Sequence, residues 1–149
     1  MPQTRRKVYR RRRILVFGGI IVILALAFYL PLTLLALMDD VDSVRVQEIV
    51  NYSHYDQAWV MRELFGFGQP LDYQSPLFNS GALTEYWGGV VTMIADALRL
   101  ELDEIREVHE FAAVDVDGDV GIGRIDAGSI AAIRFEVQGI VGGEPVVVI

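Results

Sequence analysis

The 149-residue sequence contains no cysteine. Disulfide bonds, zinc sites with thiolate ligands and thiol nucleophiles are therefore excluded. The two histidines, His54 and His109, are far apart, and no HExxH motif places a pair on one helix face. The sequence thus predicts no metal site, because it has no thiolate ligands and no two histidines at the spacing of a metal site.

Motifs of other enzyme classes are absent too. No G-x-S-x-G segment supplies the nucleophile elbow of an α/β-hydrolase. The fragment Gly121-Ile122-Gly123 has two of the three glycines of a dinucleotide-binding turn, but it lacks the third glycine and a following helix. We therefore expect no cofactor-binding residues in this chain.

Positive charge is scarce outside the first 13 residues. The chain has 13 Lys and Arg against 20 Asp and Glu, for a net charge of −7. Seven of the basic residues precede residue 14, so residues 39–149 hold the other six and all 20 acidic residues. Such an acidic body repels phosphate backbones, and no nucleic-acid partner is expected for it.

Charged residues are also missing from the whole stretch between Ile14 and Met38. An apolar run of this length after a basic cluster is typical of a membrane-spanning helix whose N-terminus stays in the cytoplasm. A cleaved signal peptide ending near Ala27 and a core helix of a soluble domain are the alternatives. The favoured interpretation gives a single-pass membrane protein with three segments: a basic cytoplasmic arm (1–13), a transmembrane or signal-anchor segment (14–38) and a folded domain (39–149).

Residue periodicity predicts an α+β class for the folded domain. Strands are expected over 43–52, 105–114, 131–138 and 145–149, and helices over 57–64, behind Asp56 as N-cap, and over 83–98. Gly142-Gly143 marks a hairpin, and the chain stops within its return strand. This order predicts a mostly antiparallel sheet with helices on one face, preceded by an N-terminal membrane helix.

Two of these elements carry sharper predictions. In the strand 131–138, alternation places Phe135 and Val137 on the buried face and Arg134 and Glu136 on the other. In the helix 83–98, the apolar stripe comprises Leu83, Tyr86, Trp87, Val90, Val91, Ile94 and Leu98. The pair Gly88-Gly89 interrupts this helix at a cost of about 1 kcal/mol per glycine. Close approach of another backbone, or a ligand at that surface, would explain the pair.

Two polar clusters are candidates for binding. Asp115, Asp117 and Asp119 have the spacing of a calcium loop, but Val120 stands where that loop needs glycine, so a solvated acidic turn is favoured. The segment from Glu48 to Asp56 has the densest mixture of polar and aromatic side chains. Binding residues often lie at such a junction of strand and helix, although a strand end that covers the core edge is the simpler interpretation.

Six stretches, taken in order, resemble a known family. They are similar to the substrate domain of dihydrodipicolinate reductase-like proteins, and most of all to the actinobacterial branch that resembles 2,4-diaminopentanoate dehydrogenase. The stretches are Leu30–Thr33, Val44–Ile49, Gly66–Pro70, Trp87–Val91, Leu102–Val108 and Arg134–Ile140. The resemblance runs from about Leu30 to Ile149, and the segment before it looks like the membrane-anchor start of actinobacterial envelope proteins.

The resemblance implies an NAD(P)-dependent oxidoreductase. In that family a separate nucleotide-binding domain supplies NAD(P)H, so this chain holds no cofactor itself, and the substrate domain places a small amino-acid-like ligand over the nicotinamide. The substrate-binding candidates that the resemblance implies are Glu48, Asn51, Tyr52, His54 and Tyr55, with Trp87 and Gly88 as a wall.

The chain departs from the reductases at their Glu-x-His-His motif. Aligning the Glu of that motif with Glu48 puts Val50 and Asn51 at the histidine pair, and His54 where a lysine follows. Catalytic residues are therefore not assigned, and catalysis is left open. The sequence is interpreted as a membrane-anchored remnant or fusion of such a substrate domain, lacking the nucleotide-binding domain. A non-catalytic binding or scaffold module is the alternative, and association of copies through the sheet is a further expectation.

Overall fold

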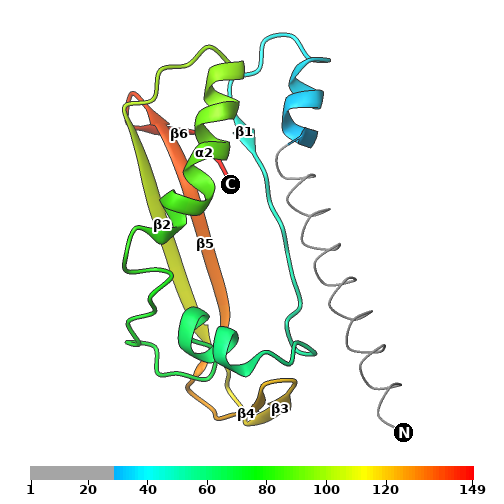
Figure 1. Ribbon diagram of the computed structural model, residues 1–149, viewed down its shortest axis with the longest axis vertical. Coiled ribbons are helices and arrows are strands. Elements are labelled where there is room, and N and C mark those ends of the chain that lie inside the picture. Colours follow the sequence, from blue (N-terminus) through cyan, green and yellow to red (C-terminus); the bar gives the residue numbers. More distant parts are fainter. Residues whose placement is uncertain (1–28) are drawn as a thin grey trace, which may run out of the picture. The chain divides into compact units, whose positions relative to one another are not determined.

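The computed structural model describes residues 29–149 (Figure 1). It divides into two units, of which one ends at Val41 and the other comprises Asp42–Ile149. The basic arm and the first half of the apolar run lie outside the described residues. In the first unit, residues 29–35 are helical. Between residues 29 and 149, no helix combines the length and apolar character needed to cross a bilayer.

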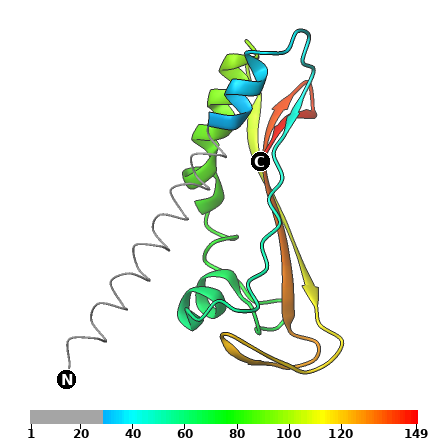
Figure 2. The ribbon, with the colours of Figure 1, turned by 90° about the vertical axis from the view of Figure 1, so that its right-hand side faces the viewer.

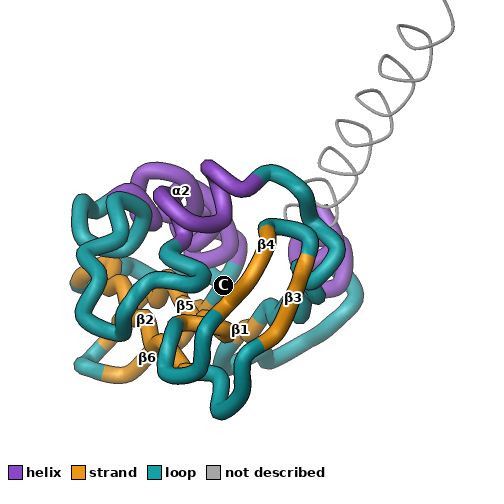
Figure 3. The backbone as a smooth tube through the Cα atoms, turned by 90° about the horizontal axis from the view of Figure 1, so that it is seen from below, coloured by secondary structure: helices purple, strands orange, loops and turns teal. Residues whose placement is uncertain are grey.

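The second unit is an α+β domain with a mixed four-stranded sheet (Figures 1 and 3). Its elements are β1 (Val44–Arg45), η1 (Val60–Phe65), α2 (Ala82–Ala97), β2 (Glu104–Ala113), β3 (Gly118–Val120), β4 (Gly123–Ile125), β5 (Ile130–Val141) and β6 (Glu144–Val148). The sheet order is β1-β6-β5-β2, with β1 and β6 parallel and the other pairs antiparallel. Strands β3 and β4 form a small separate sheet.

The core lies between α2 and the sheet. Both α2 and the short helix η1 lie on one side of β2 and β5 (Figure 2). The buried face of α2 consists of Leu83, Gly88, Val90, Val91, Ile94 and Ala95. Tyr86, which the predicted stripe included, is instead 66% exposed, because the buried stripe is narrower and Tyr86 lies beside it.

The predicted strands are found, with one large difference in length. Strands β2, β5 and β6 coincide with the predictions to within a few residues, and Gly142 and Gly143 form the hairpin with φ of 62° and 87°. The prediction for 43–52 is wrong in extent, because only Val44 and Arg45 form strand β1. They pair with Val147 and Val148 of β6, and a strand can extend only where a partner strand lies beside it.

The predicted helix over 57–64 also differs in detail. Val60–Phe65 is a π-helix, and it begins behind Trp59 without a side-chain cap, so Asp56 is not the N-cap. Its end is made by Gly66 at φ 98°, a left-handed conformation that glycine adopts without steric cost. Wide π-turns of this kind often occur near functional sites.

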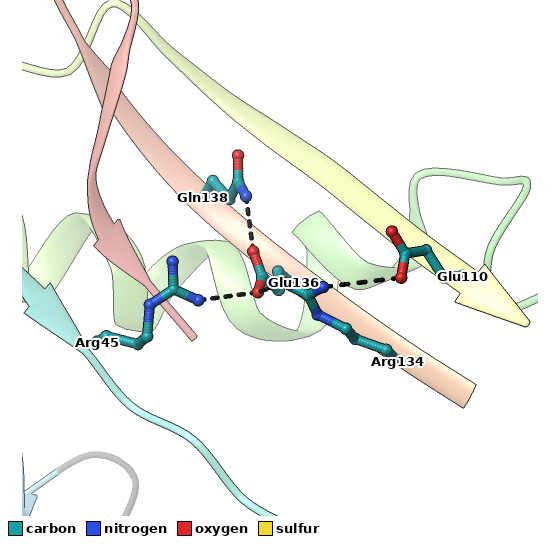
Figure 4. Close-up of polar contacts among 5 residues, drawn as sticks. All are labelled: Arg45, Glu110, Arg134, Glu136 and Gln138. Atoms are coloured by element: carbon teal, nitrogen blue, oxygen red, sulfur yellow. Dashed lines mark hydrogen bonds and ion pairs between the residues drawn. The ribbon is translucent and has the colours of Figure 1, made fainter. Parts of the chain in front are cut away.

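Strand β5 is buried on both faces near Glu136 and Val137, whereas alternation predicts one buried face. Val137 is fully buried and Phe135 half-buried on the face toward α2, as predicted. Glu136, predicted to face solvent, is only 8% exposed on the opposite face. Its carboxylate accepts hydrogen bonds from Arg45 at 2.8 Å, Arg134 at 2.6 Å and Gln138 at 2.7 Å (Figure 4). These donors cover the side chain, so it is buried but paired.

Gly139 of β5 lets α2 approach the sheet closely. A Cβ atom at Gly139 would lie 2.8 Å from Val91 Cγ1 and about as close to Leu102. We expect Gly139→Ala to lower the free energy of unfolding by about 1–3 kcal/mol, because the added methyl overpacks this contact. Urea unfolding measures the change. Gly89→Ala is the matched control, since a Cβ there meets no atom within 4 Å and the helix should gain up to about 1 kcal/mol.

Candidate functional site

Aromatic side chains form one continuous array on the helix-covered face of β2 and β5. Its centre is Phe78, which is only 4% exposed. Around it lie the rings of His109 at 5.3 Å, Phe111 at 5.5 Å, Phe135 at 5.6 Å and Phe65 at 6.3 Å, measured between ring centroids. We call this set, with Tyr52, Tyr55, Phe67, Tyr86 and Trp87, the aromatic array.

The strands supply the floor of the array. His109 and Phe111 are two residues apart on β2, so both point to the same face, and they pair with Phe135 and Ile133 of β5. Glu107, two residues earlier, is on this face as well. Its carboxylate accepts a hydrogen bond from the Thr84 backbone N–H at 2.6 Å, in the first turn of α2. Glu107 therefore fixes that helix end to β2, where a negative charge is favourable.

The loop before α2 carries Phe78 into this position. Ser75 is fully buried, and its hydroxyl donates to the Leu64 carbonyl at 2.6 Å. The same oxygen accepts the Leu77 N–H at 3.2 Å. The first bond ties the loop to η1 and the second closes a turn within the loop, so Phe78 is positioned by satisfied polar contacts and not by a regular element.

One arm of the array extends to Tyr52 and Tyr55. The Tyr52 ring lies 6.1 Å from both Phe65 and Phe67, and 5.9 Å from Tyr55. Burial raises the pKa of the Tyr52 hydroxyl above its ordinary value of 10.0, and the charges of Glu48 and Tyr55 raise it further. Tyr52 is thus a neutral phenol at physiological pH, able both to donate and to accept a hydrogen bond.

The other arm extends to Trp87. Its ring lies 5.4 Å from Phe135 and 5.8 Å from Tyr86. Because Phe65, Phe78 and Phe135 connect the two arms, Tyr52 and Trp87 belong to one array although they are distant in sequence. Aromatic faces and edges in general pack against apolar groups, and aromatic faces also attract ammonium groups.

The candidates that remain from the sequence analysis are Glu48, Asn51, His54 and Gly88. Glu48 and His54 are exposed, and Asn51 accepts the Ser53 N–H at 2.9 Å, which closes a turn. Gly88 is buried, but a Cβ there would meet Thr84 and Ile105. Gly88 is therefore approached by side chains and not by another backbone. That Gly88 forms part of a wall against the ligand stays a prediction, and so do the binding roles of the other candidates.

Sequence reasoning did not select Glu107, His109, Phe78, Phe111 or Phe135 for the site. Alternation of Glu107, His109 and Phe111 on one strand face was the available signal. In the structure this face contacts the first turn of α2 through Glu107 and Phe78 through His109.

The acidic segment is a paired hairpin in this structure. Arg124 forms ion pairs with Asp117 and with Asp126, the latter at 2.7 Å, and Asp117 also accepts the Ala127 N–H at 2.9 Å. Across residues 29–149, no group of three or more His, Asp or Glu side chains is arranged to hold a metal ion. That the hairpin binds no calcium stays a prediction.

Residues 26–149 match a known protein family. The family model of the 2,4-diaminopentanoate dehydrogenase C-terminal domain matches residues 26–149. The chain belongs to this family. An amine dehydrogenase from Streptomyces virginiae is 48% identical over 121 residues, which cover 80% of this chain and 34% of the relative. The chain therefore spans about a third of that relative's length.

Membership of the 2,4-diaminopentanoate dehydrogenase C-terminal domain family agrees with the resemblance inferred from the sequence. The match includes the second half of the apolar run, which it assigns to the family domain. The comparisons give no support to the predicted membrane anchor.

Proposed function

We propose that residues 42–149 form the substrate side of an NAD(P)-dependent amine dehydrogenase. The substrate would be a small amine, or the ketone or imine that corresponds to it, lying against the aromatic array. The observation that supports this proposal most directly is the array itself, whose ring contacts run from Tyr52 to Trp87 within a dehydrogenase family domain. The named relative acts as an amine dehydrogenase, which supports this substrate class.

The chemistry of the array fits such a substrate. Aromatic faces bind the hydrocarbon part by burial and attract the ammonium group by cation–π interaction. Tyr52 supplies a neutral hydroxyl, and Glu48, which lies near enough to raise the pKa of Tyr52, supplies a negative charge. These groups recognise an amine by charge and an imine nitrogen by hydrogen bonding.

The hydride would pass between the amine carbon and a nicotinamide held by another domain. The usual nicotinamide site is a strand, a glycine-rich turn and a helix N-terminus. No three-glycine fingerprint occurs in the sequence. In this proposal the domain binds and orients the substrate, and the cofactor supplies the redox chemistry.

Fluorescence of Trp87 tests the proposal. The chain has two tryptophans, and Trp59 is 70% exposed, so a Trp59→Phe variant reports on Trp87 alone. Titration with 2,4-diaminopentanoate and with a panel of short-chain amines and ketones should change its emission saturably, whereas NADPH alone should not. A matched Trp87→Phe variant should give no signal. The proposal fails if no amine or ketone produces saturable change, or if NADPH alone binds tightly.

A further inference from the structure

The β3–β4 hairpin makes an unusually close contact with the turn that carries His54 and Tyr55. The Gly121 N–H donates to the Ser53 carbonyl at 2.6 Å. A Cβ atom at Gly121 would lie 2.4 Å from the Tyr55 carbonyl oxygen and 2.9 Å from the His54 carbonyl carbon. The φ angle of Gly121 is not in the left-handed region, so glycine is required by space and not by backbone conformation.

A second attachment joins the same hairpin to η1. The Arg62 guanidinium donates to the Ile122 carbonyl at 3.3 Å and to the Arg124 carbonyl at 2.6 Å. The guanidinium also lies against Gly68, where a Cβ would come within 2.7 Å of it. The planar guanidinium group has several N–H donors in a fixed arrangement, so it can bind both carbonyls at once. The single ammonium group of lysine cannot reproduce this geometry.

The hairpin is braced at its base. The ion pairs of Arg124 with Asp117 and Asp126 connect its strands to the loops on both sides. Asp117 also accepts the Ala127 N–H. A hairpin fixed at its base and in contact at its tip transmits its position to the segment that it touches.

We propose that Gly121 and Arg62 are positioning residues for the substrate-binding segment 48–55. The β3–β4 hairpin contacts the backbone of Ser53, His54 and Tyr55, while the Phe65 and Phe67 rings pack near Tyr52. Together they set where Tyr52 and Tyr55 stand in the aromatic array. This inference rests on the proposed function of the array as a substrate surface.

The test compares Gly121→Ala with Gly118→Ala in the full chain. Gly118 is in the same hairpin, but a Cβ there meets no atom within 4 Å. In Gly121→Ala, the affinity for 2,4-diaminopentanoate or the best amine of the panel should fall about tenfold or more, because small misplacements of binding groups have large effects. Gly118→Ala should bind as the wild type does. Arg62→Lys should weaken binding in the same direction.

Amide hydrogen exchange gives a readout that does not depend on any ligand. The Gly121 and Tyr55 amides, which donate to Ser53 and Tyr52, should exchange about tenfold faster in Gly121→Ala, while amides of β2 and β5 keep their wild-type rates. Faster exchange across the whole sheet would show a general loss of stability and overturn the positioning role. Wild-type affinity in Gly121→Ala would overturn it too.

The two proposals fail in different ways. If the wild type binds no amine or ketone, the substrate proposal fails, and exchange at Gly121 and Tyr55 alone decides whether the hairpin positions the turn. If the wild type binds and Gly121→Ala and Gly118→Ala bind equally, the array is a substrate surface and the hairpin has no positioning role.

Discussion

Replacing Phe78 with alanine is expected to lower the free energy of unfolding by about 3–5 kcal/mol, near the upper end for core truncations. Phe78 is 4% exposed and contacts the rings of Phe65, His109, Phe111 and Phe135. Its removal leaves a cavity that the two strands cannot close, because β2 and β5 are fixed by their pairing. Urea unfolding followed by circular dichroism measures the loss.

Tyr86→Ala is the control for Phe78→Ala. Tyr86 is an aromatic residue of the same array, but it is 66% exposed, and its truncation should cost less than about 1 kcal/mol. A loss below about 1 kcal/mol for Phe78→Ala would mean that the centre of the array is not packed as described.

Glu136→Gln is expected to remove about 1–2 kcal/mol of stability at pH 7 and to flatten the acid side of the stability profile. The Arg134 guanidinium lowers the pKa of Glu136 from 4.5 to about 2, with Gln138 and Arg45 assisting, although burial opposes the shift. The Glu136 side chain is 10% exposed, whereas Arg45 and Arg134 are 55% and 63% exposed, so solvent screens the pairs and the smaller energy is appropriate.

The lowered pKa of Glu136 determines how its contribution to stability changes with pH. A carboxylate whose pKa is lower in the folded state stabilises the protein above pH 4.5, and this contribution disappears as the pH falls toward 2. Urea unfolding between pH 7 and pH 2.5 should show the two proteins converging at the acid end. Glu104→Gln, which removes an exposed ion pair with Arg106, should change stability by less than about 0.5 kcal/mol. A constant difference at all pH values would contradict the assignment.

The regular parts of the fold could be predicted because their burial is periodic. Strand β5 and helix α2 each bury one face against the other, so residues such as Val91 and Val137 repeat with the period of their element. Glu136 could not be predicted as buried. One of the side chains that cover it, Arg45, is 91 residues away in the sequence, and alternation along one strand contains no information about that partner.

Part of the candidate site could be predicted from the sequence, but the residue that connects its two arms could not. The segment 48–55 was selected for its composition, and Trp87 for the family resemblance. Phe78 connects them from a loop of helix-breaking residues, where no periodicity exists, and Ser75 holds that loop by hydrogen bonds invisible in the sequence. The excess length predicted for the strand at 43–52 shows the same limit, because alternation reports burial and not the presence of a neighbouring strand.

The two-residue strand β1 also affects how the domain folds and opens locally. It pairs Val44 and Arg45 with Val147 and Val148, which lie at the opposite end of the sequence of the Asp42–Ile149 unit, so this contact closes the longest loop of that unit. Long loops close late in folding, and short pairings of this kind open first in the native state. Strand β1, and with it the segment that leads to Tyr52, is therefore expected to open before the other strands of the sheet. A ligand that binds only the closed form would shift this equilibrium, so occupancy of the array should be readable as slower exchange at Val46, whose N–H donates to Val148.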